Sequence, residues 1–252
     1  MASKVFIVTG ASRGLGLAVA QSLIEASHKV FLVARSEKDL QVLKTQHTSS
    51  VDFIAADLAD LKIAPSIIQS ALKAFGKIDG IVLNHGILSP ITRISESSAE
   101  EWRHAFDINL FSAVALMKEA IPELRKSEGR VVFVSSGAAF NAYAGWGSYG
   151  TSKAALTHFC THLAVEEPSI TSVAISPGKV DTEMQKEIRE RGRNGMAPEV
   201  HAGFVNEHES GKLLHPGKPG NVIAKLVIGA TSDLNGKHFR WNAAELADFQ
   251  GA

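Results

Sequence analysis

A tyrosine, a lysine and a serine stand at spacings that suit acid–base chemistry. Tyr149 and Lys153 lie four residues apart in the segment GSYGTSK (147–153). If this segment is helical, both side chains leave the same face one turn apart. An ammonium beside a phenol favours the phenolate, so we expect Lys153 to lower the pKa of Tyr149 from its usual value of about 10. A phenol tuned in this way can give a proton to a carbonyl oxygen or take one from an alcohol.

A tyrosine four residues before a lysine arises by chance in roughly one such chain in eight, so the pair alone is weak evidence for catalysis. The residues around it make the evidence stronger. Ser136 ends the apolar run RVVFVSS (130–136), 13 residues before Tyr149. The carboxyl end of a parallel strand and the start of the next helix meet at the sheet edge where α/β proteins bind ligands. Ser136 can therefore donate a hydrogen bond to the oxygen on which Tyr149 acts.

A glycine-rich turn follows the first apolar run. TGASRGLG (9–16) places Gly10, Gly14 and Gly16 between the run KVFIVTG (4–10) and a helical pattern. Such a turn can hold a pyrophosphate at the helix N-terminus, although many glycine-rich turns are plain connections. Its position directly after the first strand favours a dinucleotide site.

The residues after the second strand indicate which dinucleotide is bound. Proteins that bind NAD usually carry a carboxylate about 20 residues past the glycines. Here the strand ends in Ala34 and Arg35. Arg35 can clamp a 2′-phosphate by paired, charge-assisted hydrogen bonds, and Arg13 in the glycine turn can reach the same place. The alternative is two solvated surface arginines. We expect NADP(H) as the cofactor.

Short β-branched runs alternate with longer helical stretches along the chain. The runs are apolar throughout, as in strands buried on both faces, and the alternation is typical of right-handed βαβ units. We predict the α/β class, with a single doubly wound (Rossmann-type) domain over residues 1–252. Its parallel sheet should have about seven strands and helices on both faces. The strands are expected at 4–10, 29–34, 51–56, 79–84, 130–136, 171–176 and 236–241, and the helices at 14–27, 37–47, 62–76, 99–126, 148–166 and 219–229.

The segment 177–217 breaks this rhythm, because it is polar and carries scattered glycines and prolines. One or two short helices are expected inside it. Long insertions in compact domains are usually lids or binding loops, so we predict a substrate loop over about 183–217. Trp146 and Met184 are expected to form walls of the substrate pocket.

The composition argues against several classes of partner. Basic and acidic residues number 26 each, which gives no electrostatic reason to bind nucleic acid or an anionic membrane. No apolar run reaches the roughly 18–20 residues of a membrane span, and strand-like residues begin at Lys4, so we expect no leader and a cytoplasmic protein. The single cysteine, Cys160, fits a reducing compartment. His158 and His162 lack a third ligand, so we predict no metal site.

Six stretches together resemble the classical short-chain dehydrogenase/reductase family. The resemblance covers about residues 4–240, and the sequence is most similar to the benzil reductases in the sepiapterin-reductase-like branch. The stretches are TGASRGLG (9–16), NHG (84–86), Asn109, Ser136, YGTSK (149–153) and SPGKVDT (176–182).

The resemblance implies a catalytic role for four residues. Tyr149 would be the general acid or base, Lys153 would lower its pKa and hold the nicotinamide ribose, and Ser136 would orient the carbonyl. Asn109 would hold a water molecule of a proton relay.

The resemblance also implies the cofactor contacts. Asp57 would bond the adenine, and Asn84 would lie beside the adenosine ribose. Val180 and Thr182 would contact the nicotinamide carboxamide. The full cofactor-binding set is Gly10, Ser12, Arg13, Gly14, Leu15, Gly16, Arg35, Asp57, Asn84, Tyr149, Lys153, Pro177, Gly178, Val180 and Thr182.

Two positions depart from the family's pattern. His85 stands where the family's N-N-A-G stretch has alanine, so packing beside the cofactor must adjust, and a direct role for the imidazole is the lesser alternative. Arg240 lies near the last strand, where sepiapterin reductases tend to place a carboxylate, which argues against a pterin substrate.

The resemblance also implies an oligomer. Family members commonly form dimers or tetramers through the helices expected at 99–126 and 148–166.

These features predict an NADPH-dependent carbonyl reductase that converts a ketone or α-diketone of the benzil type into an alcohol. The expected partners are a small carbonyl substrate and copies of this chain, in a homodimer or homotetramer. One alternative is an NADP-dependent alcohol dehydrogenase that uses the same residues oxidatively. The other is a nucleotide-sensing binding protein without catalysis, a class that usually lacks the tyrosine or the lysine.

Overall fold

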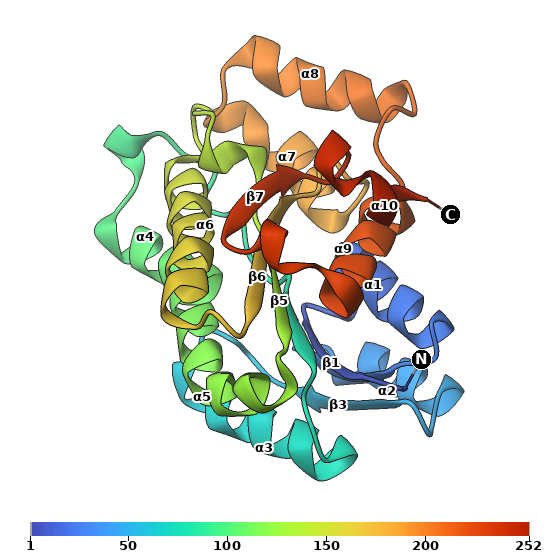
Figure 1. Cartoon of the computed structure of the whole chain (residues 1–252). Helices are drawn as coiled ribbons and strands as arrows, with labels where there is room; N and C mark the ends of the chain where they lie inside the picture. Colours follow the sequence, from blue (N-terminus) through green and yellow to red (C-terminus); the bar gives the residue numbers. More distant parts are fainter. Residues whose placement is uncertain (1, 252) are drawn as a thin grey trace.

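Seven parallel strands form one sheet in the computed structural model, which describes residues 2–251 (Figure 1). Their order across the sheet is β3-β2-β1-β4-β5-β6-β7, so the direction of winding reverses between β1 and β4. Open α/β sheets bind ligands at such a switch point. Each strand lies within its expected range. The strands are β1 (Val5–Thr9), β2 (Lys29–Ala34), β3 (Val51–Ala55), β4 (Gly80–Leu83), β5 (Arg130–Val134), β6 (Thr171–Ser176) and β7 (Lys237–Arg240).

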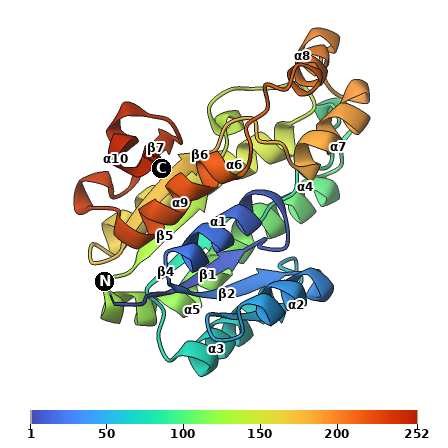
Figure 2. The ribbon, with the colours of Figure 1, turned by 90° about the vertical axis from the view of Figure 1, so that its right-hand side faces the viewer.

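Helices cover both faces of the sheet (Figures 1 and 2). One apolar core lies between the sheet and α1, α2 and α9, and a second lies between the sheet and α3, α5 and α6. The predicted doubly wound architecture is confirmed. The helices are α1 (Gly14–Glu25), α2 (Glu37–Gln46), α3 (Ala64–Phe75), α4 (Ala99–Phe106), α5 (Ser112–Ser127), α6 (Gly147–Glu166), α7 (Glu183–Arg191), α8 (Pro198–Glu209), α9 (Gly217–Gly229) and α10 (Ala247–Gln250).

The helical stretch predicted over 99–126 is found at 99–127, but it is not a regular α-helix throughout. A π-helical turn, Asp107–Phe111, separates α4 from α5, and the amide after this turn donates to the carbonyl of Asp107. The turn buries Asn109. The helical pattern of the sequence continues across the turn, so the pattern did not reveal it. Turns of this kind inside α-helices are frequent at functional sites.

The polar segment 183–217 contains two helices, α7 and α8, which agrees with the expected one or two. Pro198 stands in the first turn of α8. Amides in the first turn of a helix have no partner inside the helix, so the N–H that proline lacks is not needed there. A bridge between Val180 and Leu214 ties the start of the segment to its end. Both helices lie in the upper part of Figure 1, past the ends of β5 and β6.

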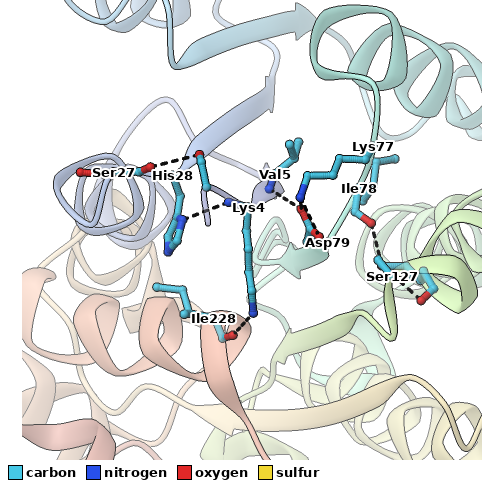
Figure 3. Close-up of polar contacts among 11 residues, drawn as sticks. Lys4, Val5, Ser27, His28, Lys77, Ile78, Asp79, Ser127 and Ile228 are labelled. Carbon is cyan, nitrogen blue, oxygen red and sulfur yellow. Dashed lines mark hydrogen bonds and ion pairs between the residues drawn. The ribbon is translucent and has the colours of Figure 1, made fainter. Parts of the chain in front are cut away.

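Polar contacts close the opposite, amino-terminal edge of the sheet (Figure 3). Lys4 Nζ donates to the carbonyl of Ile228 at 2.7 Å, and the amide of Val5 donates to the Asp79 carboxylate at 2.7 Å. The Lys4 amide donates to His28 Nδ1 at 3.2 Å. These bonds join the start of β1 to α9, to β4 and to the end of α1, so we interpret them as stabilising the fold.

Candidate active site

A cavity of about 1140 Å³ runs along the carboxyl ends of the strands. Pockets for one small ligand usually have about 300–1000 Å³, so this cavity has room for a dinucleotide together with a substrate. Two of the predicted site residues, Gly16 and Asn109, do not line it. The predicted residues in its wall are Gly10, Ser12, Arg13, Gly14, Leu15, Arg35, Asp57, Asn84, Ser136, Trp146, Tyr149, Lys153, Pro177, Gly178, Val180, Thr182 and Met184.

The glycine turn presents backbone donors to this cavity. Gly10 and Gly14 have φ angles of +66° and +56°, in the left-handed region that favours glycine. Helix α1 begins at Gly14 with no side-chain cap and no acidic residue in its first turn. Its first amides therefore keep unsatisfied N–H groups at the positive end of the helix dipole, which suits a pyrophosphate.

The third glycine of the turn, Gly16, packs closely on its neighbours and does not line the cavity, so its predicted contact with a cofactor stays a prediction. A Cβ on Gly16 would lie 2.3 Å from the Gly10 carbonyl oxygen and 2.5 Å from Asn84 Nδ2. Asn84 Nδ2 itself donates to the carbonyls of Thr9 at 3.0 Å and Gly10 at 3.3 Å. The close packing of α1 on this amide holds the turn in shape.

Ser136, Tyr149 and Lys153 meet in the same cavity. Ser136 follows β5, and the other two side chains come from the first two turns of α6. The Ser136 hydroxyl accepts a hydrogen bond from the Ala138 amide at 3.1 Å and lies close enough to Tyr149 to affect its pKa. Lys153 Nζ donates to the Val134 carbonyl at 2.9 Å and lies 6.0 Å from the centre of the Tyr149 ring.

The pKa of Tyr149 differs in direction from the sequence-based expectation. Burial raises this pKa above its usual value, and the neighbouring Ser136 hydroxyl opposes the rise only in part. Burial also lowers the pKa of Lys153 to about 8. Burial therefore outweighs the attraction between phenolate and ammonium, and Tyr149 keeps its proton at neutral pH.

The side chain of Asn109 fixes the backbone that follows β4. Its Oδ1 accepts from the Ile87 amide at 2.8 Å, and its Nδ2 donates to the Ile87 carbonyl at 2.9 Å and to Ser152 Oγ at 3.0 Å. A Cβ on Gly86 would lie 3.0 Å from Asn109 Oδ1 and 3.3 Å from Lys153 Nζ. Asn109 thus lies next to Lys153 behind the cavity wall.

His85 joins the glycine turn to the π turn. Its Nδ1 lies 2.7 Å from Thr9 Oγ1 and its Nε2 lies 2.6 Å from Ser112 Oγ, which donates to the Ile108 carbonyl at 2.6 Å. Burial first, and the charge of Lys153 second, lower the pKa of His85 to about 3. In the neutral ring one nitrogen donates its hydrogen bond and the other accepts one, so Thr9 and Ser112 take opposite roles. The sequence showed a bulkier residue here but not this pair of bonds.

The amino-acid sequence of residues 4–193 matches the family described as short chain dehydrogenase. The matched part contains the glycine turn together with Ser136, Tyr149 and Lys153. The chain is a short-chain dehydrogenase/reductase.

Two relatives of this short-chain dehydrogenase/reductase are benzil reductases ((S)-benzoin forming). The protein from Saccharomyces cerevisiae is 41% identical over 98% of this chain and 99% of its own length. The protein from Bacillus cereus is 33% identical over 89% and 94%. A crystal structure of a short-chain dehydrogenase/reductase from Saccharomyces cerevisiae is 39% identical, with a TM-score of 0.96 over 99% of this chain and 100% of the other. The KRED1-Pglu enzyme is 41% identical, with a TM-score of 0.91 over 94% and 100%.

Members of this family use nicotinamide cofactors, and the wall of the cavity fits one. The uncapped start of α1 suits the pyrophosphate, as described above. Arg13 and Arg35 are both exposed and both line the cavity, and the buried Ala34 that ends β2 brings no carboxylate. Ser36 and Asp39 also line this end. Sequence reasoning missed these two, although Ser36 stands directly between β2 and α2.

The substrate end of the short-chain dehydrogenase/reductase has an aromatic wall. Trp146 and Met184 line it, and the Trp146 ring meets the Tyr149 ring edge to face at 5.9 Å. Phe140 and His238 also line the cavity. Sequence reasoning did not bring these two together, because one follows β5 and the other lies on β7.

The sequence also predicts that the chain has no metal site and no membrane-spanning helix. The rings of His158 and His162 lie edge to face at 4.7 Å. Within residues 2–251, no three side chains of histidine, cysteine, aspartate or glutamate gather as a metal ion would require. Across the same residues, each helix is too short or too polar to cross a membrane. Cys160 is buried, which raises its pKa to about 12.

Proposed function

We propose that this short-chain dehydrogenase/reductase is an NADPH-dependent carbonyl reductase that converts ketones or α-diketones of the benzil type into alcohols. The observation that carries the proposal is the meeting of Ser136, Tyr149 and Lys153 in the cavity that also contains the uncapped glycine turn. The two relatives named benzil reductase support the class of substrate.

The side chains divide the chemistry of reduction among them. NADPH, if held by the glycine turn and the arginines, would supply the hydride that the carbonyl carbon accepts and would be oxidised to NADP⁺. Tyr149 gives its hydroxyl proton to the carbonyl oxygen, so C=O becomes CH–OH. Ser136 donates a hydrogen bond to the same oxygen while negative charge develops there. Lys153, with a pKa of about 8, is largely protonated at neutral pH and stabilises the phenolate left on Tyr149.

The same proposal assigns the two ends of the cofactor. Arg35, with Arg13, would hold the 2′-phosphate that distinguishes NADPH from NADH. Asp57 would lie beside the adenosine, and Val180 and Thr182 would lie beside the carboxamide. All five residues line the cavity, which supports this placement.

The experiment that tests the proposal is a substrate panel read by loss of NADPH absorbance and by product analysis. Benzil, 1-phenyl-1,2-propanedione, 2,3-butanedione and benzaldehyde would each be offered with NADPH and with NADH. We expect one molecule of alcohol product for each NADPH consumed, and a higher kcat/KM with NADPH than with NADH. A protein that binds NADPH but reduces none of the panel would support the nucleotide-sensing alternative instead.

A further inference from the structure

One side of the substrate end is an inner wall made of Leu88, Trp146, Met184 and Phe204. The Trp146 ring lies 5.4 Å from the Phe204 ring, and Leu88 and Met184 belong to the same apolar cluster. All four residues line the cavity. Its members come from four segments, because Leu88 follows β4, Trp146 precedes α6, and Met184 and Phe204 lie on α7 and α8. The inner wall offers an apolar seat beside Tyr149, which packs against Trp146.

The other side is an outer platform made of Phe140 and His238. Phe140 is 61% exposed, an unusual degree for a phenylalanine, and its ring lies on the His238 imidazole at 4.4 Å with an interplanar angle of 38°. His238 Nε2 is bonded to Ser176 Oγ at 2.8 Å, which fixes the imidazole. Both residues line the cavity. The platform is therefore an aromatic surface with one open face.

Phe140 is held at a fixed place relative to Ser136. Both belong to one short turn, in which the Ala139 amide donates to the Ser136 carbonyl at 3.0 Å and the Phe140 amide donates to the Gly137 carbonyl at 3.2 Å. The His238 ring restrains the Phe140 side chain from beneath. A large aromatic surface that is already ordered binds a ligand with little loss of conformational entropy.

Both surfaces adjoin the reacting groups. Trp146 of the inner wall meets the Tyr149 ring edge to face at 5.9 Å. Phe140 of the outer platform belongs to the same short turn as Ser136. All four residues line the one cavity, so a carbonyl held by Ser136 and Tyr149 would have an aromatic surface near each of the two groups that hold it.

We propose that the outer platform is a second aryl subsite, so that the preferred substrate carries aromatic groups on both sides of the reacting carbonyl, as a diaryl ketone or diaryl α-diketone does. This inference rests on the proposed function and deepens it. One aryl group packs on the inner wall, and the other stacks on the open face of Phe140. Aromatic rings prefer such offset or edge-to-face contacts.

The test compares three diketones that differ only in the number of aryl groups: benzil with two, 1-phenyl-1,2-propanedione with one, and 2,3-butanedione with none. Each is measured with the wild type, Phe140→Leu and His238→Leu. Phe140→Leu keeps an apolar side chain but removes the ring, so we expect kcat/KM for benzil to fall about 3- to 10-fold. The value for 2,3-butanedione should stay unchanged. Lys237→Ala, on β7 but outside the cavity wall, is the control variant.

Two results would overturn the second subsite. One is an equal loss for all three diketones, which would mean that the substitution only displaces Ser136. The other is an unchanged kcat/KM for benzil in Phe140→Leu. If the wild type reduces none of the diketones, the proposed function fails, and the subsite is then judged by calorimetric titration of benzil into the complex with NADPH. Phe140→Leu should weaken that binding by the same factor, and an unchanged Kd would overturn the subsite.

Discussion

Tyr149 and Lys153 are only 6% and 3% exposed, and burial disfavours the charged form of each side chain. The pKa of the phenol rises and that of the ammonium falls to about 8, so near pH 7 both groups hold their protons. A protonated tyrosine is the form required to reduce a carbonyl. The attraction between the ammonium and Tyr149 becomes strong only when the phenolate forms. An interaction that is stronger in the transition state than in the ground state accelerates the reaction.

The first prediction concerns pH. Lys153 loses its proton as the pH rises through about 8, and the charge that stabilises the phenolate is lost with it. The kcat/KM for carbonyl reduction should therefore be high below about pH 8 and fall above it, measured at saturating NADPH. In Lys153→Arg, which stays charged over this range, the fall should disappear even if activity is lower. A wild-type profile that is flat from about pH 7 to pH 10 would contradict the role of Lys153.

The second prediction concerns the choice of cofactor and depends on Arg35. A guanidinium and the 2′-phosphate form charge-assisted hydrogen bonds of roughly 1.5–3 kcal/mol each, and the exposed position of Arg35 favours the lower end. Arg35→Ala should raise the KM for NADPH about tenfold and leave NADH kinetics nearly unchanged. Lys38→Ala removes a neighbouring charge that does not line the cavity, so it is the matched control. A wild type that prefers NADH would contradict the assignment.

At the scale of secondary structure, His85 ties two elements that carry site residues. It bonds Thr9 at the end of β1 and Ser112 at the start of α5, so its imidazole spans the glycine turn and the π turn. The π turn in turn carries Asn109, whose amide holds the backbone at Ile87. Burial disfavours the charged form of this imidazole, and the ring stays neutral at pH 7.

The third prediction follows from the lowered pKa of His85. The folded pKa is about 3 and the unfolded value about 6.5, so the unfolded chain binds more protons between these limits. The contribution of His85 to stability is therefore complete above about pH 6.5 and is lost as the pH falls. At pH 5 the loss should be about 1–2 kcal/mol. It is measured by denaturant unfolding of the wild type and His85→Asn at pH 7 and pH 5.

The difference between the two proteins in how much stability they lose from pH 7 to pH 5 isolates the contribution of His85. Burial also lowers the pKa of His28 and His238, and both remain in the variant, so their effect cancels in the difference. His85→Asn should be less stable at pH 7 but lose less stability than the wild type between pH 7 and pH 5. Equal losses in the two proteins would contradict a neutral, doubly bonded imidazole.

The elements could be predicted where one physical signal dominated. Apolar runs such as 130–136 specify buried strands, and all seven were located in this way. The π turn could not be predicted, because the residues of one widened turn have no composition that separates them from those of a regular helical turn. The packing of Gly16 on Asn84 could not be predicted either, because a spacing cannot distinguish a glycine that faces a ligand from one packed on a side chain. The bonds of His85 depend on Ser112, which no short motif links to it.

At the scale of the whole molecule, the order of the strands decides which residues meet. Ser136, Tyr149 and Lys153 were predicted to converge because one strand and its following helix carry all three. Phe140 and His238 meet only because β7 lies beside β6. Local sequence patterns predict strands but not their order in the sheet. The pKa of Tyr149 was predicted in the wrong direction for a related reason. The sequence shows the neighbouring charge but not how completely the fold buries the phenol.

The fourth prediction concerns assembly. We expect a homodimer or homotetramer built on the helices predicted at 99–126 (α4 and α5) and 148–166 (α6), and α6 carries Val165, which is 76% exposed. An apolar side chain at such a contact is buried on association, so Val165→Glu should shift the protein towards monomer in sedimentation velocity. Ile94→Glu is the matched control, because Ile94 is 74% exposed but lies outside these helices. A monomeric wild type, or equal effects of the two substitutions, would contradict this assembly.

The central claim is that Tyr149 transfers the proton, and the chain supplies its own control because it has only two tyrosines. Tyr149→Phe and Tyr143→Phe each remove one hydroxyl and little volume. With benzil as substrate, we expect Tyr149→Phe to lower kcat about 10²–10⁴-fold while its affinity for NADPH is kept, because only general acid catalysis is lost. Tyr143→Phe should stay within about threefold of the wild type. Turnover by Tyr149→Phe as fast as that of Tyr143→Phe would contradict the account.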